Sequence, residues 1–445
     1  MKAPVTFPII FCVVFGSSAS SLSSQSVADP QILAEVRAIR AIDNHSHVVR
    51  VVKDGETDDE GDAIGCGGLE FVSPPPMRLR VDNPIYAGAW RELFGYRYFD
   101  MTGAHVKELL SAKQNIMRRE GDNYPTWILD KLNIDIMLAN RVAMGRGLPA
   151  PRFRWVTYGD PFLLPFSTTV TRKANSDRRY FFSQQEKWFK RDLAESKFAN
   201  LPPTLDQYLK NVVGRTLERH KAGGAIAVKF VAAYYRSLEF DNVPKSDAQS
   251  IYARFYRGGE PSETEYKRFQ NFMFRYVVGE SGKLGLVVHI HTGGGCGHFF
   301  NLRTSNPILL ESVINDPAYR STKIVLIHGG YPFTNEVAFL LEKPGIYADF
   351  SAQTFLLSPV ALSKILRSWL EYEPEKILFG TDASPATPEV GWEESAWLTS
   401  KVAREALAIA LTGMVQDGEI TRARASELAR MVMRENAAGL YGFPK

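Results

Sequence analysis

The chain has 445 residues, of which 45% are hydrophobic and 23% are charged, and its formal net charge is +4. The hydrophobic fraction is too high and the charge too balanced for a disordered chain, and the length allows one large domain or two medium ones. No clustered basic surplus marks a nucleic-acid binder. After the N-terminus, no stretch reaches the roughly 20 apolar residues that a membrane span needs. The composition therefore predicts a globular protein.

Residues 1–24 are predicted to be a secretory signal peptide. Lys2 gives a positive start, Val5 to Phe15 form an apolar core, and small residues follow from Gly16 to Ser24. This order is typical of a cleaved signal, and the apolar run is too short for a spanning helix. We therefore expect export to the periplasm or the medium, with residues 25–445 as the mature chain. An ordinary apolar N-terminal tail is the alternative.

Eight short apolar runs, often β-branched, recur along the mature chain and alternate with helical stretches. Buried parallel strands have this pattern because both of their faces are covered. The predicted strands are Ala41–Val48, Asp135–Ala139, Phe153–Tyr158, Ala225–Ala232, Gly285–Thr292, Lys323–His328, Ile346–Phe350 and Lys376–Thr381. Before the fifth strand, a capping box at Ser262–Glu265 predicts a helix that stops at Gly279 and Gly282. The alternation predicts one (β/α)8 TIM barrel, with a doubly wound open sheet as the rival fold.

Two long insertions interrupt the alternation, after the first and third predicted strands. Residues 49–134 are rich in Gly, Pro and aromatic side chains, and residues 159–222 are polar and partly helical. Loops that follow the strands of a barrel gather at its catalytic mouth. Both insertions are therefore expected there, where they can act as lids.

Side chains that can bind a metal stand at the ends of several predicted strands. His45 and His47 lie two residues apart at the end of the first, so both are expected on one face. His291, His328 and Asp382 close the fifth, sixth and eighth strands in "LVVHIH", "KIVLIH" and "KILFGTD". Burying these polar groups would be costly without a metal or partners. The pattern predicts a divalent metal site, with zinc as the expected ion.

This series of strand-end residues resembles the amidohydrolase superfamily. It is most similar to the amidohydrolase-related branch that includes the N-terminal domain of FluG-type and nodulin/glutamine-synthetase-like fusion proteins. The similarity runs from about Ala41 to the C-terminus and includes "VKFVAAYYRSL", "IHTGGG", "NPILLESVINDPAYR", "IHGGYPF", "FGTDA" and "ENAAGLYGF". The resemblance implies a barrel with one or two divalent ions that hydrolyses an amide, or a related C–N or ester bond, of a small-molecule substrate.

The resemblance also implies roles for the matching residues. The main ion is expected to be held by four residues, His45, His47, His291 and Asp382. His328 is expected either to complete a second metal site with Lys229 or to act as a base or an electrophile. Asp382 is expected to take the proton from the attacking water and to pass it to the leaving amine.

Lys229 lies near the end of the fourth predicted strand, among residues that are predicted to belong to the core. In the superfamily, a lysine at this strand is often carboxylated and bridges two metal ions. A buried neutral amine could take up carbon dioxide in this way, whereas a buried bare ammonium would be costly. The alternatives are an unmodified lysine that binds a substrate carboxylate and a lysine that reaches out of the strand to solvent.

Other polar residues have weaker signals. His289 is expected one layer deeper in the barrel, as a hydrogen-bonding neighbour of the ligands. His298, in the loop after the fifth strand, and Arg236, just past the fourth, are predicted to contact substrate, Arg236 by gripping a carboxylate. A surface histidine and a surface ion pair are the alternatives. His105 and His220 are interpreted as structural.

Cys66 and Cys296 both lie in Gly-rich segments, after the first and fifth predicted strands. Both are therefore expected on the catalytic face, and an exported protein can keep a disulfide. A bridge that pins the first insertion across the mouth is our hypothesis for these residues.

Two functions other than hydrolysis are compatible with the sequence. The same branch includes metal-dependent non-oxidative decarboxylases of carboxylic acids, often aromatic, and a non-catalytic barrel is the third reading. The chain lacks the Gly-x-Ser-x-Gly sequence of a serine hydrolase. Neither nucleic acid nor, after signal removal, a membrane is expected as a partner, and a homo-oligomer is left open.

Overall fold

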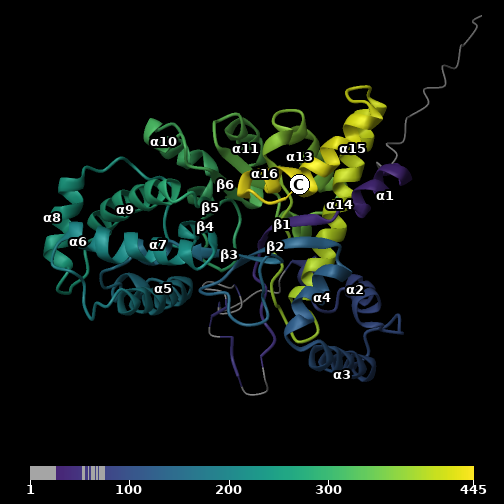
Figure 1. Ribbon diagram of the computed structural model, residues 1–445, viewed down its shortest axis with the longest axis horizontal. Coiled ribbons are helices and arrows are strands. Elements are labelled where there is room, and N and C mark those ends of the chain that lie inside the picture. Colours follow the sequence, from purple (N-terminus) through teal and green to yellow (C-terminus); the bar gives the residue numbers. More distant parts are fainter. Residues whose placement is uncertain are drawn as a thin grey trace, which may run out of the picture.

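The computed structural model describes residues 27–52, 56–58, 60–61, 66, 69 and 76–444, and the predicted signal peptide lies outside them. Eight parallel strands follow one another in chain order around one sheet, with helices around it (Figure 1). The strands are β1 (Ala41–Ser46), β2 (Ile134–Asn140), β3 (Phe153–Tyr158), β4 (Ala225–Phe230), β5 (Val287–His291), β6 (Ile324–Ile327), β7 (Ile346–Asp349) and β8 (Ile377–Leu378). Each strand overlaps one predicted run, which confirms the (β/α)8 barrel over the open sheet.

Sixteen α-helices are found among the described residues, and none of them is long and apolar enough to cross a membrane. They are α1 (Pro30–Ala38), α2 (Ile85–Phe94), α3 (Gly103–Glu120), α4 (Tyr124–Lys131), α5 (Ser176–Glu195), α6 (Leu205–Gln207), α7 (Arg215–Ala222), α8 (Lys245–Phe255), α9 (Glu263–Lys283), α10 (Glu311–Ile314), α11 (Thr334–Leu341), α12 (Gln353–Leu356), α13 (Pro359–Leu370), α14 (Trp392–Gln416), α15 (Arg422–Arg430) and α16 (Asn436–Tyr441).

Backbone hydrogen bonds between β1 and the segment around β8 bring the two edges of the sheet together. The amide of Asn44 donates to Phe379 O at 2.9 Å, and the amide of Asp382 donates to His45 O at 2.7 Å. Farther along, the amide of His47 donates to Ala383 O, which follows β8, at 2.7 Å. Three of the predicted ligands therefore hold the barrel closed with their own backbone, so the position of each one depends on the others.

The alternation of side chains along the strands separates an inner cluster from an outer one. Val287 of β5 and Val325 of β6 belong to the inner cluster, while Val288 and Leu326 pack outward against the helices. Residues of α16 and Phe443 join the inner cluster. The C-terminal segment therefore closes the end of the barrel that lies opposite the mouth.

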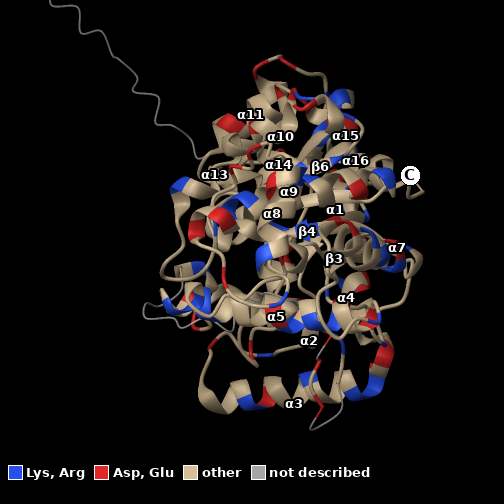
Figure 2. Ribbon diagram, turned by 90° about the vertical axis from the view of Figure 1, so that its left-hand side faces the viewer, with Lys and Arg blue, Asp and Glu red and all other residues tan. Residues whose placement is uncertain are grey.

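Helices form much of the described part of both insertions. The first contributes α2, α3 and α4, and α3 lies at the lower edge in Figures 1 and 2. Trp90 Nε1 in α2 donates to Glu389 O at 3.0 Å, and Lys113 Nζ in α3 donates to Glu394 Oε1 at 2.8 Å. These bonds fix the insertion to the start of α14. The second insertion forms α5 and a continuous helix in which π-helical turns join α6 to α7.

Helix α9 begins with the predicted capping box. The amide of Glu265 donates to Ser262 Oγ at 3.4 Å, and the amide of Ser262 donates to Glu265 Oε2 at 3.1 Å. The helix ends at Lys283, beyond Gly279 and directly after Gly282, the two glycines at which it was predicted to end. Gly282 serves close packing instead, because a Cβ there would lie 2.2 Å from Thr322 Oγ1, just before β6.

Cys66 and Cys296 form a disulfide across 230 residues, with their Cα atoms 5.9 Å apart. The bridge joins the first insertion to the loop after β5, the strand that ends at His291. The hypothesis of a disulfide that ties this insertion to the mouth is confirmed.

Thiol titration provides a direct check of this bridge. We expect the mature, unreduced and denatured protein to show no reactive thiol, because the remaining cysteine, Cys12, leaves with the predicted signal peptide. After reduction, two thiols are expected to react. Two reactive thiols before reduction would contradict the disulfide.

Candidate metal centre

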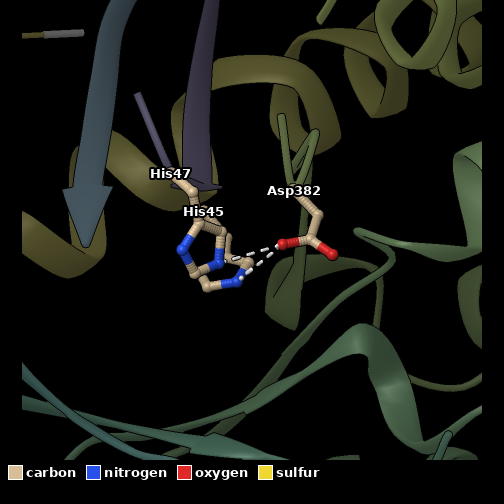
Figure 3. Close-up of side chains that lie close together, drawn as sticks. All are labelled: His45, His47 and Asp382. Atoms are coloured by element: carbon tan, nitrogen blue, oxygen red, sulfur yellow. Dashed lines mark ion pairs between the residues drawn. The ribbon is translucent and has the colours of Figure 1, made fainter. Parts of the chain in front are cut away.

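Three of the predicted ligands meet at the mouth of the barrel. The Nε2 atoms of His45 and His47 lie 3.1 and 3.2 Å from Oδ1 of Asp382 (Figure 3). His45 is buried, whereas the side chains of His47 and Asp382 are 15% and 16% exposed to solvent. Solvent can therefore reach the cluster. Two imidazoles and a carboxylate are a donor set typical of zinc and other first-row divalent ions.

An irregularity in β1 aims the two histidines at the mouth. Ile42 and Asn44 point into the barrel, so strict alternation along the strand would turn His45 outward. The pairing of β1 with β2 shifts register between Asp43 and Ser46, and His45 points to the mouth instead. Alternation alone gives the two histidines a common face, and the local register shift makes that face point to the mouth.

His291 and His328 lie beside this cluster, and hydrogen bonds define which nitrogen of each ring carries a proton. The Ser351 hydroxyl donates to Asp349 Oδ1 at 2.6 Å, so it can only accept from Nδ1 of His328, 2.8 Å away. The carbonyl oxygen of Gly294 lies 3.1 Å from His291 Nε2 and also accepts. In the neutral rings, the lone pairs are therefore on His328 Nε2 and His291 Nδ1.

These two lone pairs face each other. His328 Nε2 and His291 Nδ1 are 3.1 Å apart, and two acceptor nitrogens at this distance repel unless a cation binds both. Two nitrogens bound to one tetrahedral zinc ion, with bonds of about 2.0–2.1 Å, lie roughly 3.4 Å apart. His328 Nδ1 also lies 3.9 Å from Asp382 Oδ2. The five predicted strand-end residues thus form one contiguous group, and their chemistry fits a divalent ion.

Two of these residues have left-handed backbones. The φ angle is 66° at His328 and 57° at Asp382, a conformation that is costly for residues other than glycine. The surrounding hydrogen bonds hold it, because the His328 amide donates to Asp349 Oδ1 at 2.9 Å and the Asp382 amide donates to His45 O. Strained residues of this kind cluster at functional sites.

Two residues that support His328, Asp349 and Ser351, were not among those predicted from the sequence. Asp349 accepts hydrogen bonds from the His328 amide, from Ser351 Oγ and, at 2.8 Å, from Asn44 Nδ2. It ends β7, inside the predicted run Ile346–Phe350, and is a polar residue at the end of an apolar strand, as the predicted ligands are. That signal was present in the sequence. The role of Ser351 depends on the fold and has no such signal.

A second layer of hydrogen bonds lies deeper in the barrel. Tyr441 OH, from α16, donates to Asn44 Oδ1 at 2.6 Å and therefore accepts from His289 Nε2 at 2.7 Å. His289 thus lies below the mouth, as expected, and Asn44 connects this layer to Asp349. The C-terminal helix therefore helps to orient residues that surround the site.

The buried histidines of the mouth are neutral at pH 7. Burial, followed by the positive charge of Lys229, lowers the pKa of His45 well below its usual value and that of His291 to about 3. Burial also lowers the pKa of His328. For Asp382, burial raises the pKa, but the neighbouring histidines outweigh this and bring it below the usual value. The site therefore offers neutral imidazoles and an ionised carboxylate, the protonation states that bind a metal.

Lys229 lies on β4 and is only 1% exposed. This burial excludes the alternative in which its side chain reaches out to solvent. In the sheet it is paired with Tyr158 of β3 and His289 of β5. Carboxylation and contact with a substrate carboxylate both stay as predictions for this residue.

Arg236 and His298 differ in what they can offer a substrate. The guanidinium nitrogens of Arg236 all donate within the protein, to backbone oxygens of Ser237, Glu239 and Lys267 and to side-chain oxygens of Gln270 and Asn271. These donors hold the loop after β4 to α9, and the predicted contact of Arg236 with a substrate carboxylate stays a prediction. His298 is half-buried in the loop after β5, and its contact with substrate stays a prediction.

Comparison with known sequences gives one family and one curated relative. Residues 254–443 match the family model described as amidohydrolase. A stretch of 156 residues, 35% of this chain, is 32% identical to the protein fluG of Emericella nidulans and covers 17% of that protein's length. Both matches agree with the resemblance that the strand-end residues predicted.

Comparison with solved structures extends the likeness to nearly the whole chain. A Lactobacillus casei protein, described as a candidate metal-dependent hydrolase, is 16% identical, with a TM-score of 0.63 over 94% of this chain and 98% of its own. Glucuronate isomerase of Caulobacter crescentus is 13% identical, with a TM-score of 0.63 over 93% of each chain. Uronate isomerase of Thermotoga maritima is 14% identical, with a TM-score of 0.55 over 94% and 98%. At these identities the likeness shows the fold alone.

Proposed function

We propose that this chain, which belongs to the amidohydrolase superfamily, is a metal-dependent hydrolase of amide or related C–N or ester bonds in a small molecule. The observation that carries the proposal is the convergence of five residues from four strand ends at one mouth, His45, His47, His291, His328 and Asp382. The superfamily's metal-dependent hydrolase fold supports it.

The donor set indicates which residues would hold the metal. His45, His47 and Asp382 provide one group of donor atoms, and His291 and His328 bring two further lone pairs beside it. A divalent ion bound there, for which we propose zinc, would lower the pKa of a water molecule and polarise the scissile carbonyl. Lys229 is the residue that would decide between one ion and two, through its carboxylation.

Asp382 would transfer the proton in the reaction. Its carboxylate is ionised, partly exposed and within 3.2 Å of His45 and His47. It can therefore accept a proton from the attacking water and hand it to the leaving amine. His328, whose Nδ1 donates to Ser351, would offer its Nε2 lone pair to the ion or act as a base through it.

Metal analysis followed by a substrate screen tests the proposal. We expect the purified mature protein to contain at least one divalent ion per chain. Hydrolysis of a substrate found among N-acyl amides, γ-glutamyl amides and lactones should disappear after chelation and return with Zn²⁺. Release of carbon dioxide from an aromatic acid without incorporation of water would favour the decarboxylase instead. A protein that keeps no metal at neutral pH would favour a non-catalytic barrel.

We also propose that the chain is exported after cleavage near residue 24. The order of residues 1–24 supports this proposal, and the Cys66–Cys296 bridge suits an oxidising compartment. We propose a small-molecule substrate as the partner, with neither nucleic acid nor a membrane bound by the mature chain.

A further inference from the structure

A second group of side chains that can bind a metal lies on the flank of the barrel. Asp192 and Glu195 lie one turn apart at the end of α5, and His220 lies in the last turn of α7. One donor atom of each lies within 4.8 Å of the others. The three residues line a cavity of about 180 Å³, to which none of the five residues at the mouth contributes.

The spacing of the buried atoms suits a cation better than a direct hydrogen bond. Asp192 Oδ1 lies 3.8 Å from His220 Nε2 and 3.7 Å from Arg219 Nη2, and both distances are too long for hydrogen bonds. Asp192 and His220 are only 7% and 8% exposed. Within the described part of the chain, neither this carboxylate nor His220 Nε2 has a hydrogen bond. An ion between donors 3.8 Å apart would lie about 2 Å from each, the length of a bond from zinc to nitrogen or oxygen.

The other nitrogen of His220 is held in place. Its Nδ1 lies 2.9 Å from Thr157 Oγ1, and its ring lies against Trp155 with the ring centres 4.9 Å apart. Both partners come from the outer face of β3. When Nδ1 donates its proton to Thr157 Oγ1, the lone pair of Nε2 faces Asp192, as in a metal-binding histidine whose other nitrogen is hydrogen-bonded.

Glu195 completes the group but already has two partners. Arg191 Nε lies 2.8 Å from one carboxylate oxygen, and Arg219 Nη2 lies 3.0 Å from the other. The side chains of both arginines are more than one-third exposed. They can therefore turn into solvent and release Glu195 to a stronger cation.

We propose that Asp192, Glu195 and His220 form a second, peripheral binding site for a first-row divalent ion such as Zn²⁺. One imidazole and two carboxylates suit an ion of this class. The site would tie α5 of the second insertion to α7 and, through Thr157, to β3. It contributes no residue to the reaction, so the proposal does not depend on the hydrolase assignment.

Calorimetric titration of the metal-depleted mature protein with Zn²⁺ tests this site. We expect the wild type to bind one equivalent more than His220→Asn, whose amide can keep the hydrogen bond to Thr157 while the Nε2 ligand is lost. Asp192→Asn should lose the same equivalent, with affinity at this site lowered at least about 10-fold. Metal at the mouth and hydrolytic activity should stay unchanged in both variants.

His105→Asn is the matched control, because His105 pairs with Asp100 at 2.7 Å on the exposed side of α3. It should bind as many equivalents as the wild type. If His220→Asn does not fold, Glu195→Gln provides the same comparison from a partly exposed position. Equal numbers of bound Zn²⁺ ions in the wild type and in all folded variants of the three residues would overturn the proposal.

Discussion

Replacing Asp382 by asparagine is expected to abolish turnover, with a fall in kcat of at least about 100- to 10,000-fold on the substrate that the screen identifies. This range is the usual contribution of a general acid–base residue. The amide keeps the shape of the side chain but cannot accept and return a proton. It also removes the negative charge beside His45 and His47, so metal affinity should fall as well.

The measurement therefore needs metal content and kcat from the same sample, with zinc added to saturation. Asp135→Asn is the matched control, because Asp135 lies on β2, where it pairs with Arg434 at 3.0 Å, outside the cluster at the mouth. That variant should keep its activity. Near-normal kcat in metal-loaded Asp382→Asn would refute the proton-transfer role.

Replacing Lys113 by methionine is expected to lower the free energy of unfolding by about 3–5 kcal/mol, the usual result of breaking a buried ion pair. Lys113 Nζ lies 2.8 Å from Glu394 Oε1, and the two side chains are 8% and 0% exposed. Glu394 Oε2 also accepts from the Gly391 amide at the start of α14. Without the ammonium group, a buried carboxylate stays behind at the contact between α3 and α14.

The pH dependence of this loss distinguishes the mechanism. Burial raises the pKa of Glu394 to about 7 even in the presence of Lys113, so the folded state holds its proton to a higher pH than the unfolded chain does. A group with a raised pKa stabilises the folded state below its unfolded pKa and loses this contribution as the pH rises through the folded pKa. The deficit of Lys113→Met should therefore be larger at pH 8 than at pH 6.

Two further variants complete the denaturation series. Lys113→Met combined with Glu394→Gln should recover part of the lost stability, because no charge stays buried. Lys190→Met removes an exposed partner of Glu186 and should change the unfolding free energy by no more than about 0.5 kcal/mol. A deficit of Lys113→Met that is equal at pH 6 and pH 8 would show that lost packing, rather than the buried charge, causes the effect.

The predicted elements differ in how well a sequence can define them. The strands were predictable because each is short, apolar and buried on both faces, as in "KIVLIH" and "LVVHIH". The helices of the first insertion were not, because its Gly- and Pro-rich composition conceals α2 and α3, whose stability comes from contacts with α14 and the loop before it. Tertiary packing supplied what local propensity did not indicate.

The candidate site shows the same division. His45, His47 and Asp382 were recognisable because a polar residue that ends an apolar strand has few structural explanations. The partners of the Arg236 guanidinium could not be predicted from the sequence because Gln270 and Asn271 lie 34 and 35 residues away, on α9. The approach of His220 to Asp192 could not be predicted, because Asp192 precedes it by a whole loop and helix and leaves no sequence pattern.

By itself, the sequence determined the barrel, the two insertions and the strand ends that carry the predicted ligands, because buried strands impose a local apolar pattern. Only the tertiary structure decided the ring tautomers of His291 and His328, through Gly294 and Ser351. It alone also decided the turn of His45 toward the mouth, through the register shift in β1. Hydrogen-bond direction and strand register depend on groups far apart in the chain, and a local pattern of residues carries no record of them.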